Sequence, residues 1–314
     1  MVSIIIPTYN CGDFIAEAVQ SVIDQDYPEK EIIIINDGST DDTCAVLKRF
    51  GDAINVINQK NYGETAARNV GVRTARGDYI AFLDADDVWL PRKLTHQVRY
   101  LEAHPEAGVV YTAWRNWEPS SDGKFVRPSC VGNELDEGVV DHANSGWLYN
   151  RLLLDSLLLP TAVMLRASLV HRIGEFDITL PYGCDYDYWI RASRLAEIHK
   201  LKGVGALYRI RSSSLSYMVK MRNFEHEVVC KAIDQWGLVG PDGVESDRSV
   251  IDKRLRDLVF RHAYTHFWRG DPRQALGAFL HVLRERPANA KLWAYIILAA
   301  VKALKPRGVR RSPF

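Results

Sequence analysis

The sequence predicts an α/β fold over residues 1–215, a mostly parallel sheet flanked by helices, followed by an all-helical region over residues 216–314. Short apolar, β-branched runs alternate with helical patterns through residue 104, which is typical of strand–helix–strand units. The runs are continuously apolar, as expected of parallel strands buried on both faces. With 314 residues, 47% of them hydrophobic, the chain is long enough to bury a full core.

The elements of the first half follow one another as strand and helix. Asp13 and the run Ser39–Asp42 are suited to cap helices, Pro91 to stand in a first turn, and Gly51 and Gly77 to end helices. Buried strands are expected at Val2–Ile6, Glu31–Ile35, Ile54–Ile57 and Tyr79–Leu83, and helices at 13–23, 39–51, 64–75 and 91–103.

Polar residues stand after each of these expected strands. Parallel sheets bind ligands outside the carboxyl ends of their strands, so these side chains are predicted to converge on one pocket. The residues are Tyr9, Asn10, Asp37, Asn61, Asp84 and Asp86.

The stretch FLDADDVW, residues 82–89, places Asp84, Asp86 and Asp87 at the end of the fourth strand. Clustered carboxylates repel one another unless a cation lies among them, and Mg²⁺ combines one or two protein carboxylates with substrate phosphates and water. Alternation along an extended segment puts Asp84 and Asp86 on the same side. The pattern therefore favours a divalent-metal site. The alternative is that these residues only end a strand and cap the next helix.

Composition and missing motifs argue against several classes of protein. The formal net charge of +1 gives no global field for a nucleic-acid partner. The five cysteines show no CxxC spacing, which argues against a disulfide framework or a zinc site and fits a reducing, cytoplasmic location. The sequence contains no signal-peptide pattern, no apolar stretch of about 20 residues, and neither GxGxxG nor GxxxxGK[ST].

Four motifs in order carry a resemblance to a known family. They are SIIIPTYN at 3–10, IINDGSTDDT at 34–43, NYGETAARNVGVRTARGDYIAFLDADDVW at 61–89 and GCDYDYWIRAS at 183–193. In these motifs the chain resembles the family-two glycosyltransferases, which have the GT-A fold and use nucleotide-sugar donors. The resemblance covers residues 1–215 and implies a nucleotide-binding half at 1–104 and an acceptor-binding half at 105–215.

The resemblance implies roles for the residues of the nucleotide pocket. Tyr9 would stack on the base, and the backbone around Pro7 and the Asp37 carboxylate would hydrogen-bond it. Asn61 and Arg68 would complete the pocket. A carboxylate accepts the imide N–H that uracil and thymine carry and cytosine lacks, so UDP or dTDP sugars are favoured over CDP sugars.

Asp84 and Asp86 resemble the family's DxD motif, which implies that Asp86 ligates Mn²⁺ or Mg²⁺ directly and that Asp84 lies nearer the ribose or sugar. Where many relatives carry a histidine near the metal or diphosphate, this chain carries Arg211. Arginine cannot ligate a metal but pairs with phosphate. We therefore expect the metal and Arg211 to share the neutralisation of the diphosphate, with a weaker metal dependence.

Residues 157–193 are predicted to form an edge strand, a short helix, a loop and an amphipathic helix that starts near Asp185. The resemblance makes Asp185 the catalytic base of an inverting transfer, with Asp187 as the alternative base. A simple N-cap is the other interpretation of Asp185. The acidic residue often found before the base is replaced here by Cys184.

The expected function is an inverting transfer of a sugar from a nucleoside diphosphate, with UDP favoured, to a hydroxyl of a glycan or lipid-linked acceptor in envelope polysaccharide synthesis. One alternative is a catalytically weak, sugar-nucleotide-binding scaffold that acts through its helical C-terminal region. A sugar nucleotidyltransferase is disfavoured, because PTYNCGDF at 7–14 lacks the Gly-rich, basic loop that such an enzyme needs.

The helices expected beyond residue 216 lie at 217–236, 250–268, 272–284 and 288–304, and residues 270–293 resemble a single tetratricopeptide-like hairpin. The last helix contains LWAYIILAAV, which is apolar on all faces, and basic residues flank it. It is too short to span a bilayer. It is expected either to be a core helix or to make a peripheral contact, through residues 288–311, with an anionic inner leaflet.

Overall fold

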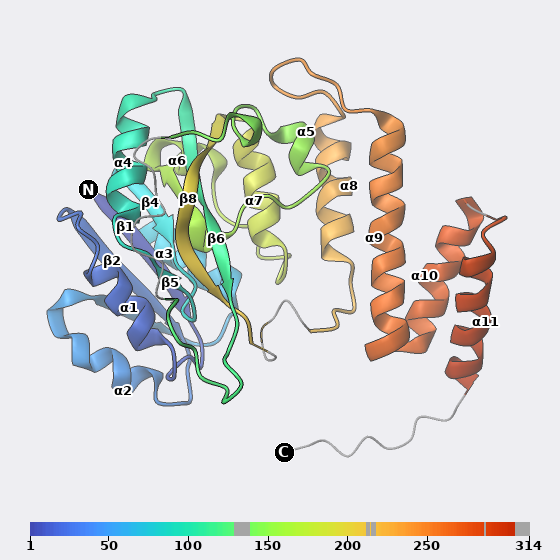
Figure 1. Cartoon of the computed structure of the whole chain (residues 1–314), viewed down its shortest axis with the longest axis horizontal. Coiled ribbons are helices and arrows are strands. Elements are labelled where there is room, and N and C mark those ends of the chain that lie inside the picture. Colours follow the sequence, from blue (N-terminus) through green and yellow to red (C-terminus); the bar gives the residue numbers. More distant parts are fainter. Residues whose placement is uncertain (129–138, 212–213, 215–217, 286, 305–314) are drawn as a thin grey trace. The chain divides into compact units, whose positions relative to one another are not determined.

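The structure is a computed structural model, which describes all residues except 129–138, 212–213, 215–217, 286 and 305–314 (Figure 1). The chain forms two compact units. The first comprises Met1–Ser212 and Val239–Glu245, and the second comprises Ser213–Leu238 and Ser246–Phe314. The predicted α/β fold with an all-helical appendage is confirmed.

An eight-stranded sheet in the order β3-β2-β1-β4-β7-β6-β8-β5 organises the first unit. Strands β3, β2, β1 and β4 are parallel, whereas β7 is antiparallel to both β4 and β6. Strand β8 is parallel to β6 and antiparallel to β5. The bounds are β1 Val2–Thr8, β2 Lys30–Asp37, β3 Asn55–Gln59, β4 Tyr79–Phe82, β5 Val88–Trp89, β6 Ala107–Trp117, β7 Val163–Arg166 and β8 Glu197–Arg209.

Helices cover both faces of the parallel strands (Figure 1). Ile4 and Ile6 of β1 share a buried cluster with residues of α1 and α4, while Ile33 of β2 packs with Ala67 of α3 on the other face. Gly71 lets α3 approach β1 closely, because a Cβ there would lie 2.3 Å from a side-chain carbon of Ile5. The bounds are α1 Ile15–Ile23, α2 Thr43–Leu47, α3 Glu64–Thr74, α4 Lys93–Ala103, α5 Tyr149–Leu152, α6 Ala167–Ile173 and α7 Cys184–Ser193, with 3₁₀ turns η1 Lys48–Ala53, η2 His142–Asn144 and η3 Pro160–Ala162.

The prediction of an edge strand in the 157–193 segment is wrong. Strand β7 lies between β4 and β6 and is hydrogen-bonded on both sides. Its residues Val163, Met164 and Leu165 are fully buried, as an interior position requires. The edge next to β8 is formed instead by the two-residue strand β5.

The second unit consists of helices α8 Phe224–Trp236, α9 Arg248–Arg269, α10 Pro272–Glu285 and α11 Ala290–Leu304. The predicted helix at 217–236 begins, within the described residues, at Phe224, where the Asn223 side chain accepts a hydrogen bond from the backbone N–H of His226. Helix α10 packs against both α9 and α11 around a core that includes Phe267, Phe279 and Ile296. The hairpin expected at 270–293 thus joins α10 to the start of α11.

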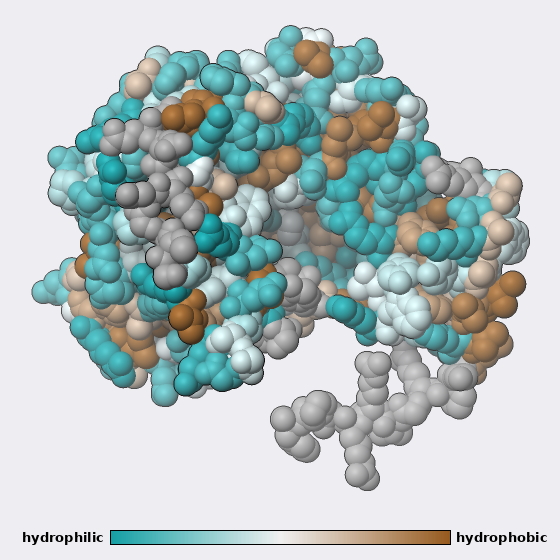
Figure 2. Space-filling view, in the orientation of Figure 1, coloured by the Kyte–Doolittle hydropathy of each residue, from teal (hydrophilic) through white to brown (hydrophobic). Residues whose placement is uncertain are grey.

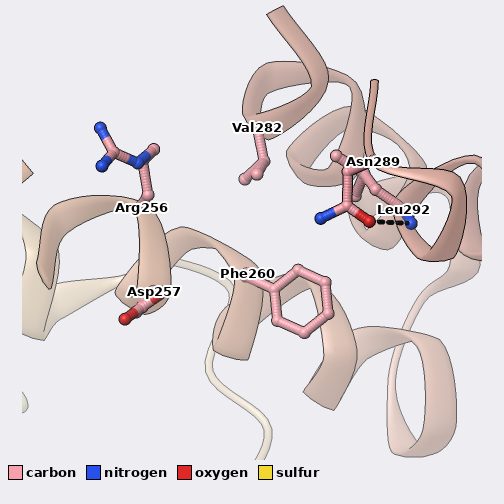
Figure 3. Close-up of a pocket in the computed structure, with 6 residues that line it drawn as sticks. All are labelled: Arg256, Asp257, Phe260, Val282, Asn289 and Leu292. Carbon is pink, nitrogen blue, oxygen red and sulfur yellow. Dashed lines mark hydrogen bonds between the residues drawn. The ribbon is translucent and has the colours of Figure 1, made fainter. Parts of the chain in front are cut away.

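A cleft of about 190 Å³ lies between α9 and the α10–α11 hairpin (Figure 3). Asn289 lines it and caps α11, its side-chain oxygen accepting a hydrogen bond from Leu292 N at 3.1 Å. The volume is below the range of pockets that enclose cofactor-sized ligands. Among the helices of the described residues, none combines the length and apolarity needed to cross a bilayer.

Candidate active site

Three neighbouring parallel strands have their carboxyl ends on the same side of the sheet, which is called the carboxyl edge below. Strand β1 pairs in parallel with β2 on one side and with β4 on the other. Tyr9, Asp37 and Asp84 therefore stand at or just beyond the ends of adjacent strands. The topology brings the polar residues after β1, β2 and β4 to the carboxyl edge, which is where the sequence placed a pocket.

Asp37 is buried, only 3% exposed, and its carboxylate fixes the loop that leads into α3. Oδ1 accepts hydrogen bonds from Gln59 Nε2 at 2.6 Å and from Tyr62 N at 2.9 Å, and Oδ2 accepts one from Gly63 N at 2.8 Å. Because a carboxylate oxygen has two lone pairs, Oδ2 keeps capacity for a further donor. Asp37 can thus shape the loop and accept a hydrogen bond from a ligand.

The remaining residues predicted to bind the base lie in β1 or in the loops that follow β1 and β3. Tyr9 is 48% exposed and Asn61 is exposed, whereas Pro7 is buried within β1. Gly38, with φ +76°, lets the loops after β2 and β3 meet, since a Cβ at this position would lie 2.8 Å from Asn61 N. An exposed aromatic ring beside a polar strand end is suited to stack on a flat base.

Arg68 of α3 is buried next to the loop that follows β4 and is not exposed to solvent on the helix surface. Its side chain is 4% exposed and pairs with Asp84 at 2.8 Å and with Glu64, one helical turn earlier on α3. The guanidinium also donates to Cys184 Sγ at 3.7 Å, at the first residue of α7. Arg68 therefore connects β4, α3 and α7 at the predicted reaction centre.

The three carboxylates of FLDADDVW have different surroundings. Asp87 is fully buried and accepts hydrogen bonds from Thr161 Oγ1 at 2.7 Å and from Arg209 N at 2.9 Å. Burial raises the pKa of Asp87 well above its usual range, with Asp84 and Asp86 adding to the rise. Asp87 thus has a structural position, while Asp84 and Asp86 are partly exposed at the strand end.

Two arginines hold the loop around Asp86. Arg211 forms an ion pair with the Asp86 carboxylate, and Arg209 Nε donates to the Asp86 carbonyl at 2.6 Å. Burial raises the pKa of Asp86 and Asp84 adds to the rise, whereas Arg211 opposes it. Arg209 is buried, with its guanidinium carbon 4.2 Å from the centre of the Trp117 ring. This rigid support fixes the backbone that carries the DxD pair.

Asp185 is the second residue of α7 and is partly buried. Burial raises its pKa, Arg68 opposes the rise, and the Asp84 carboxylate adds to it. Asp187 is instead 4% exposed and forms an ion pair with Arg191 at 2.8 Å, one turn further along α7. Asp187 is thus engaged in holding α7, whereas Asp185 interacts electrostatically with Arg68 and Asp84.

Asp84 and Asp86 suit a hard divalent cation. Both present carboxylate oxygens, the ligands that Mg²⁺ and Mn²⁺ prefer, and each uses one oxygen in its arginine ion pair. Over the described ranges, no group of three or more His, Cys, Asp and Glu residues could hold a metal ion. The donor set therefore fits a metal whose remaining positions are filled by phosphates and water, and it does not fit an all-protein cage.

Two residues of this site, Glu64 and Arg209, were not predicted from the sequence. Burial raises the pKa of Glu64 to about 7: Arg68 opposes this effect, and the carboxylates of Asp84, Asp185 and Asp86 reinforce it. Glu64 and Arg68 stand four residues apart on a predicted helix, a spacing that predicts an ion pair. The ring contacts of Arg209 with Phe14, Trp117 and Phe125 carried no local signal, because the partners lie far apart in the sequence.

Comparison with known proteins identifies the family of this chain. The sequence model of the family described as glycosyl transferase family 2 matches residues 3–129. An uncharacterised glycosyltransferase of Rickettsia felis is 31% identical over 73% of this chain and 37% of its own length. The UDP-Glc:alpha-D-GlcNAc-diphosphoundecaprenol beta-1,3-glucosyltransferase WfaP of Escherichia coli is 30% identical over 69% of this chain and 80% of its own length. The first Rickettsia relatives are longer proteins, of which this chain spans 32% to 60%.

Solved structures show the same fold. TarS 1–349 of S. aureus in complex with UDP-GlcNAc superposes with a TM-score of 0.61 at 20% identity, covering 96% of this chain and 88% of that one. The mannosyltransferase PcManGT of Pyrobaculum calidifontis, in complex with GDP-Man and Mn²⁺, gives 0.53 at 18% identity, covering 96% and 86%. The architecture is that of a GT-A glycosyltransferase with a helical appendage. The chain belongs to glycosyl transferase family 2.

Proposed function

We propose that this enzyme transfers a sugar from a nucleoside diphosphate sugar, with UDP as the favoured nucleotide, to a hydroxyl of a glycan or lipid-linked acceptor, with inversion at the anomeric carbon. The donor and acceptor named for WfaP, and the UDP-GlcNAc bound by TarS, support this choice of substrates. Its relatives with named pathways, including a putative teichuronic acid glycosyltransferase of Bacillus subtilis, support a role in envelope polysaccharide synthesis.

The arrangement around Arg68 is the observation that carries the proposal. This buried guanidinium pairs with Asp84 of the DxD pair and acts electrostatically on Asp185, while it also contacts the residue before Asp185. A donor-side carboxylate and an acceptor-side carboxylate therefore belong to one charge cluster. Inverting transfer needs this juxtaposition, because the acceptor hydroxyl must lose its proton where the anomeric carbon is attacked.

In the proposed reaction, Asp185 accepts the proton of the acceptor hydroxyl as that oxygen bonds to the anomeric carbon. The bond from this carbon to the diphosphate oxygen breaks in the same displacement, and the nucleoside diphosphate leaves with the electron pair. Burial strengthens Asp185 as a base because it raises its pKa. A single displacement from the opposite face inverts the configuration.

Residues of the strand end hold the donor in this proposal. Tyr9 stacks on the base, Asp37 accepts its imide N–H, and the backbone near Pro7 and the side chain of Asn61 complete the contacts. Tyr9 and Asn61 are exposed, which leaves both side chains accessible to a ligand. Arg68 closes the pocket from below.

The diphosphate is proposed to lie against Asp84, Asp86 and Arg211. A divalent cation held by Asp86 with Asp84 supplies, when bound, neutralisation of charge on the leaving group. Arg211 can turn from Asp86 to a phosphate oxygen and provide part of the same neutralisation.

We assign residues 1–215 to the glycosyltransferase domain, with donor contacts in 1–104 and acceptor contacts in 105–215, and residues 216–314 to a helical appendage. The proposed location is cytoplasmic, at the inner face of the cytoplasmic membrane, where a lipid-linked acceptor would be reached through peripheral contact by residues 288–311. That the described helices include none able to cross a bilayer is compatible with such contact.

The test combines calorimetry with a transfer assay. UDP, dTDP, GDP and CDP are titrated with and without Mn²⁺, and UDP-sugar turnover is compared for the wild type, Asp185→Asn and Asp187→Asn. We expect Asp185→Asn to keep UDP affinity and lose turnover by about 10²-fold or more, since it removes the general base. Asp187→Asn is expected to keep the turnover of the folded protein.

Other outcomes of these two assays would change the proposed base or the proposed function. Turnover retained by Asp185→Asn but lost by Asp187→Asn moves the base to Asp187. Nucleotide binding without turnover from any donor, in the wild type as well, favours the catalytically weak scaffold. No nucleotide binding at all rejects the donor class.

A further inference from the structure

Helix α11 has an apolar face that its own unit does not bury. Leu292, Ile296 and Ala299 point into the helical core. The opposite side, here called the outward face, consists of Trp293, Ile297, Leu298, Val301 and Leu304, which are 46%, 59%, 52%, 52% and 85% exposed. Figure 2 shows hydrophobic residues gathered over α11 at the lower right of the molecule. The helix is thus apolar on both sides, as its sequence predicted, and only one of these sides is buried in the helical core.

The outward face is unusual for a helix exposed to water. Surface helices place charged and polar residues opposite their buried stripe. Along α11, no charged residue occurs between Lys291 and Lys302. A contiguous apolar surface of this kind marks a contact site with another apolar phase or molecule.

The part of the sequence that contains α11 carries charge of one sign. After Glu285 the sequence contains no acidic residue, and its basic residues are Arg286, Lys291, Lys302, Lys305, Arg307, Arg310 and Arg311. The whole chain has a formal net charge of only +1, so this concentration is local. An apolar stripe flanked by basic residues is the composition of helices that lie in the headgroup region of anionic bilayers.

Two contacts hold the ends of the face in place. The indole N–H of Trp293 donates to the Pro287 carbonyl at 2.8 Å, which orients the ring at the start of the helix. Lys302 Nζ donates to the Phe267 carbonyl at 3.1 Å and lies 4.9 Å from the centre of the Trp268 ring, itself 59% exposed. Tryptophan is favoured at membrane–water interfaces because its ring is apolar and its N–H is polar.

We infer that the outward face of α11 docks on an anionic lipid surface, with the helix lying in the plane of the headgroups and the positive charge of the sequence after Glu285 attracting lipid phosphates. A second copy of the chain is a poorer occupant. A symmetric contact would bring two sets of basic flanks together without acidic partners in this segment. The lipid surface supplies the complementary charge.

This inference extends the proposed location and does not depend on sugar transfer. It identifies the surface that makes the contact and the lipid chemistry that it selects. The two proposals therefore fail separately: a protein that binds vesicles but no nucleotide would refute the donor proposal alone.

The experiment is flotation of the full chain with vesicles of phosphatidylcholine alone and with 30% phosphatidylglycerol, at about 0.1 M and 1 M salt. We expect binding to the anionic vesicles that is at least tenfold weaker on neutral vesicles and weaker at high salt. The variant Ile297→Gln/Val301→Gln is expected to lose at least tenfold in partition to anionic vesicles. Leu280→Gln on α10, where Leu280 is 43% exposed, is the matched control and should bind as the wild type does.

Circular dichroism checks that the double variant stays folded, and calorimetry checks that its UDP affinity is unchanged. A second variant, Lys305→Glu/Arg307→Glu, tests the charge without altering the apolar face and should also weaken binding to anionic vesicles. Equal binding of the wild type and the Ile297/Val301 variant, or no binding to either vesicle, overturns the inference. Sedimentation that shows a wild-type dimer, dissociated by Ile297→Gln/Val301→Gln in the absence of vesicle binding, would assign the face to a second copy and also overturn it.

Discussion

Replacing Glu64 with glutamine tests the charge balance beneath the DxD pair. In the folded protein, burial raises the pKa of Glu64 to about 7 from an ordinary value of 4.5. The folded state thus binds more protons than the unfolded chain between these values. The contribution of Glu64 to stability is therefore fully present below pH 4.5 and is lost as the pH rises through about 7.

The structure sets the size of this effect. A rise from 4.5 to about 7 corresponds to about 3 kcal/mol, since one pH unit is worth about 1.4 kcal/mol. One third of the Glu64 side chain is exposed, 33%, so solvent screens the interaction and we expect about 1–2 kcal/mol. Glutamine has nearly the shape of the protonated acid. At pH 8, Glu64→Gln should therefore raise the free energy of unfolding by about 1–2 kcal/mol, and at pH 4.5 it should match the wild type within about 0.5 kcal/mol.

Urea unfolding of both proteins between pH 4.5 and pH 8 measures this difference. Other titrating groups are common to both proteins and largely cancel in the comparison. Glu64→Asp retains the charge and serves as the control, for which no gain at pH 8 is expected. A destabilised Glu64→Gln at pH 8, or a difference that does not change with pH, would show that the Arg68 ion pair outweighs burial at Glu64 and would refute the reasoning.

Two further variants separate ligand contacts from structural ones. Arg211→Ala should weaken UDP binding by about 10-fold or more and make it more dependent on Mn²⁺, because a charge-assisted contact worth about 1.5–3 kcal/mol is lost. Arg211→Lys should restore part of the UDP affinity in calorimetry. Unchanged UDP affinity and metal dependence in Arg211→Ala would show that this residue does not bind the diphosphate. Asp187→Asn should lower the free energy of unfolding by about 3 kcal/mol in urea, because Arg191 loses its buried partner at 2.8 Å, while UDP affinity stays as in the wild type. A loss below about 1 kcal/mol would mean that the ion pair does not hold α7.

Much of the first half could be predicted because its signals are local. Apolar runs marked the strands and helices through α4, and the parallel arrangement followed from their alternation. The predicted cap Asp13 and the predicted helix end Gly51 are wrong, because α1 follows Phe14 and Gly51 lies inside η1. The convergence of strand-end residues is a consequence of that topology. Helix starts were less accurate: α4 begins at Lys93 rather than at Pro91, after Arg92 adopts a left-handed conformation with φ 68°.

The second half of the sheet depends on pairings that no local pattern specifies. Strand β7 has four residues and becomes an interior strand only because β4 and β6 bind its two sides. Likewise, the burial of Arg209 against Phe14 and Trp117 requires segments far apart in sequence. The sequence motif identified where the carboxylates stand, but not which of them is structural.

The four carboxylates near Arg68 and Arg211 together determine the net charge of the candidate site. Glu64 and Asp84 each interact electrostatically with Asp86 and Asp185, and the ion pairs of this cluster come from Arg68 and Arg211. When all four acids are ionised, the cluster has excess negative charge and opposes a diphosphate that arrives alone. In the proposed site, a divalent cation at Asp86 would offset this excess and would leave Arg211, whose charge is already part of the cluster, able to pair with the phosphates. Nucleotide and cation should therefore bind with positive coupling: the UDP affinity gained on adding Mn²⁺ should equal the Mn²⁺ affinity gained on adding UDP, as linkage requires, and the gain should shrink in Asp86→Asn, which has less charge to offset.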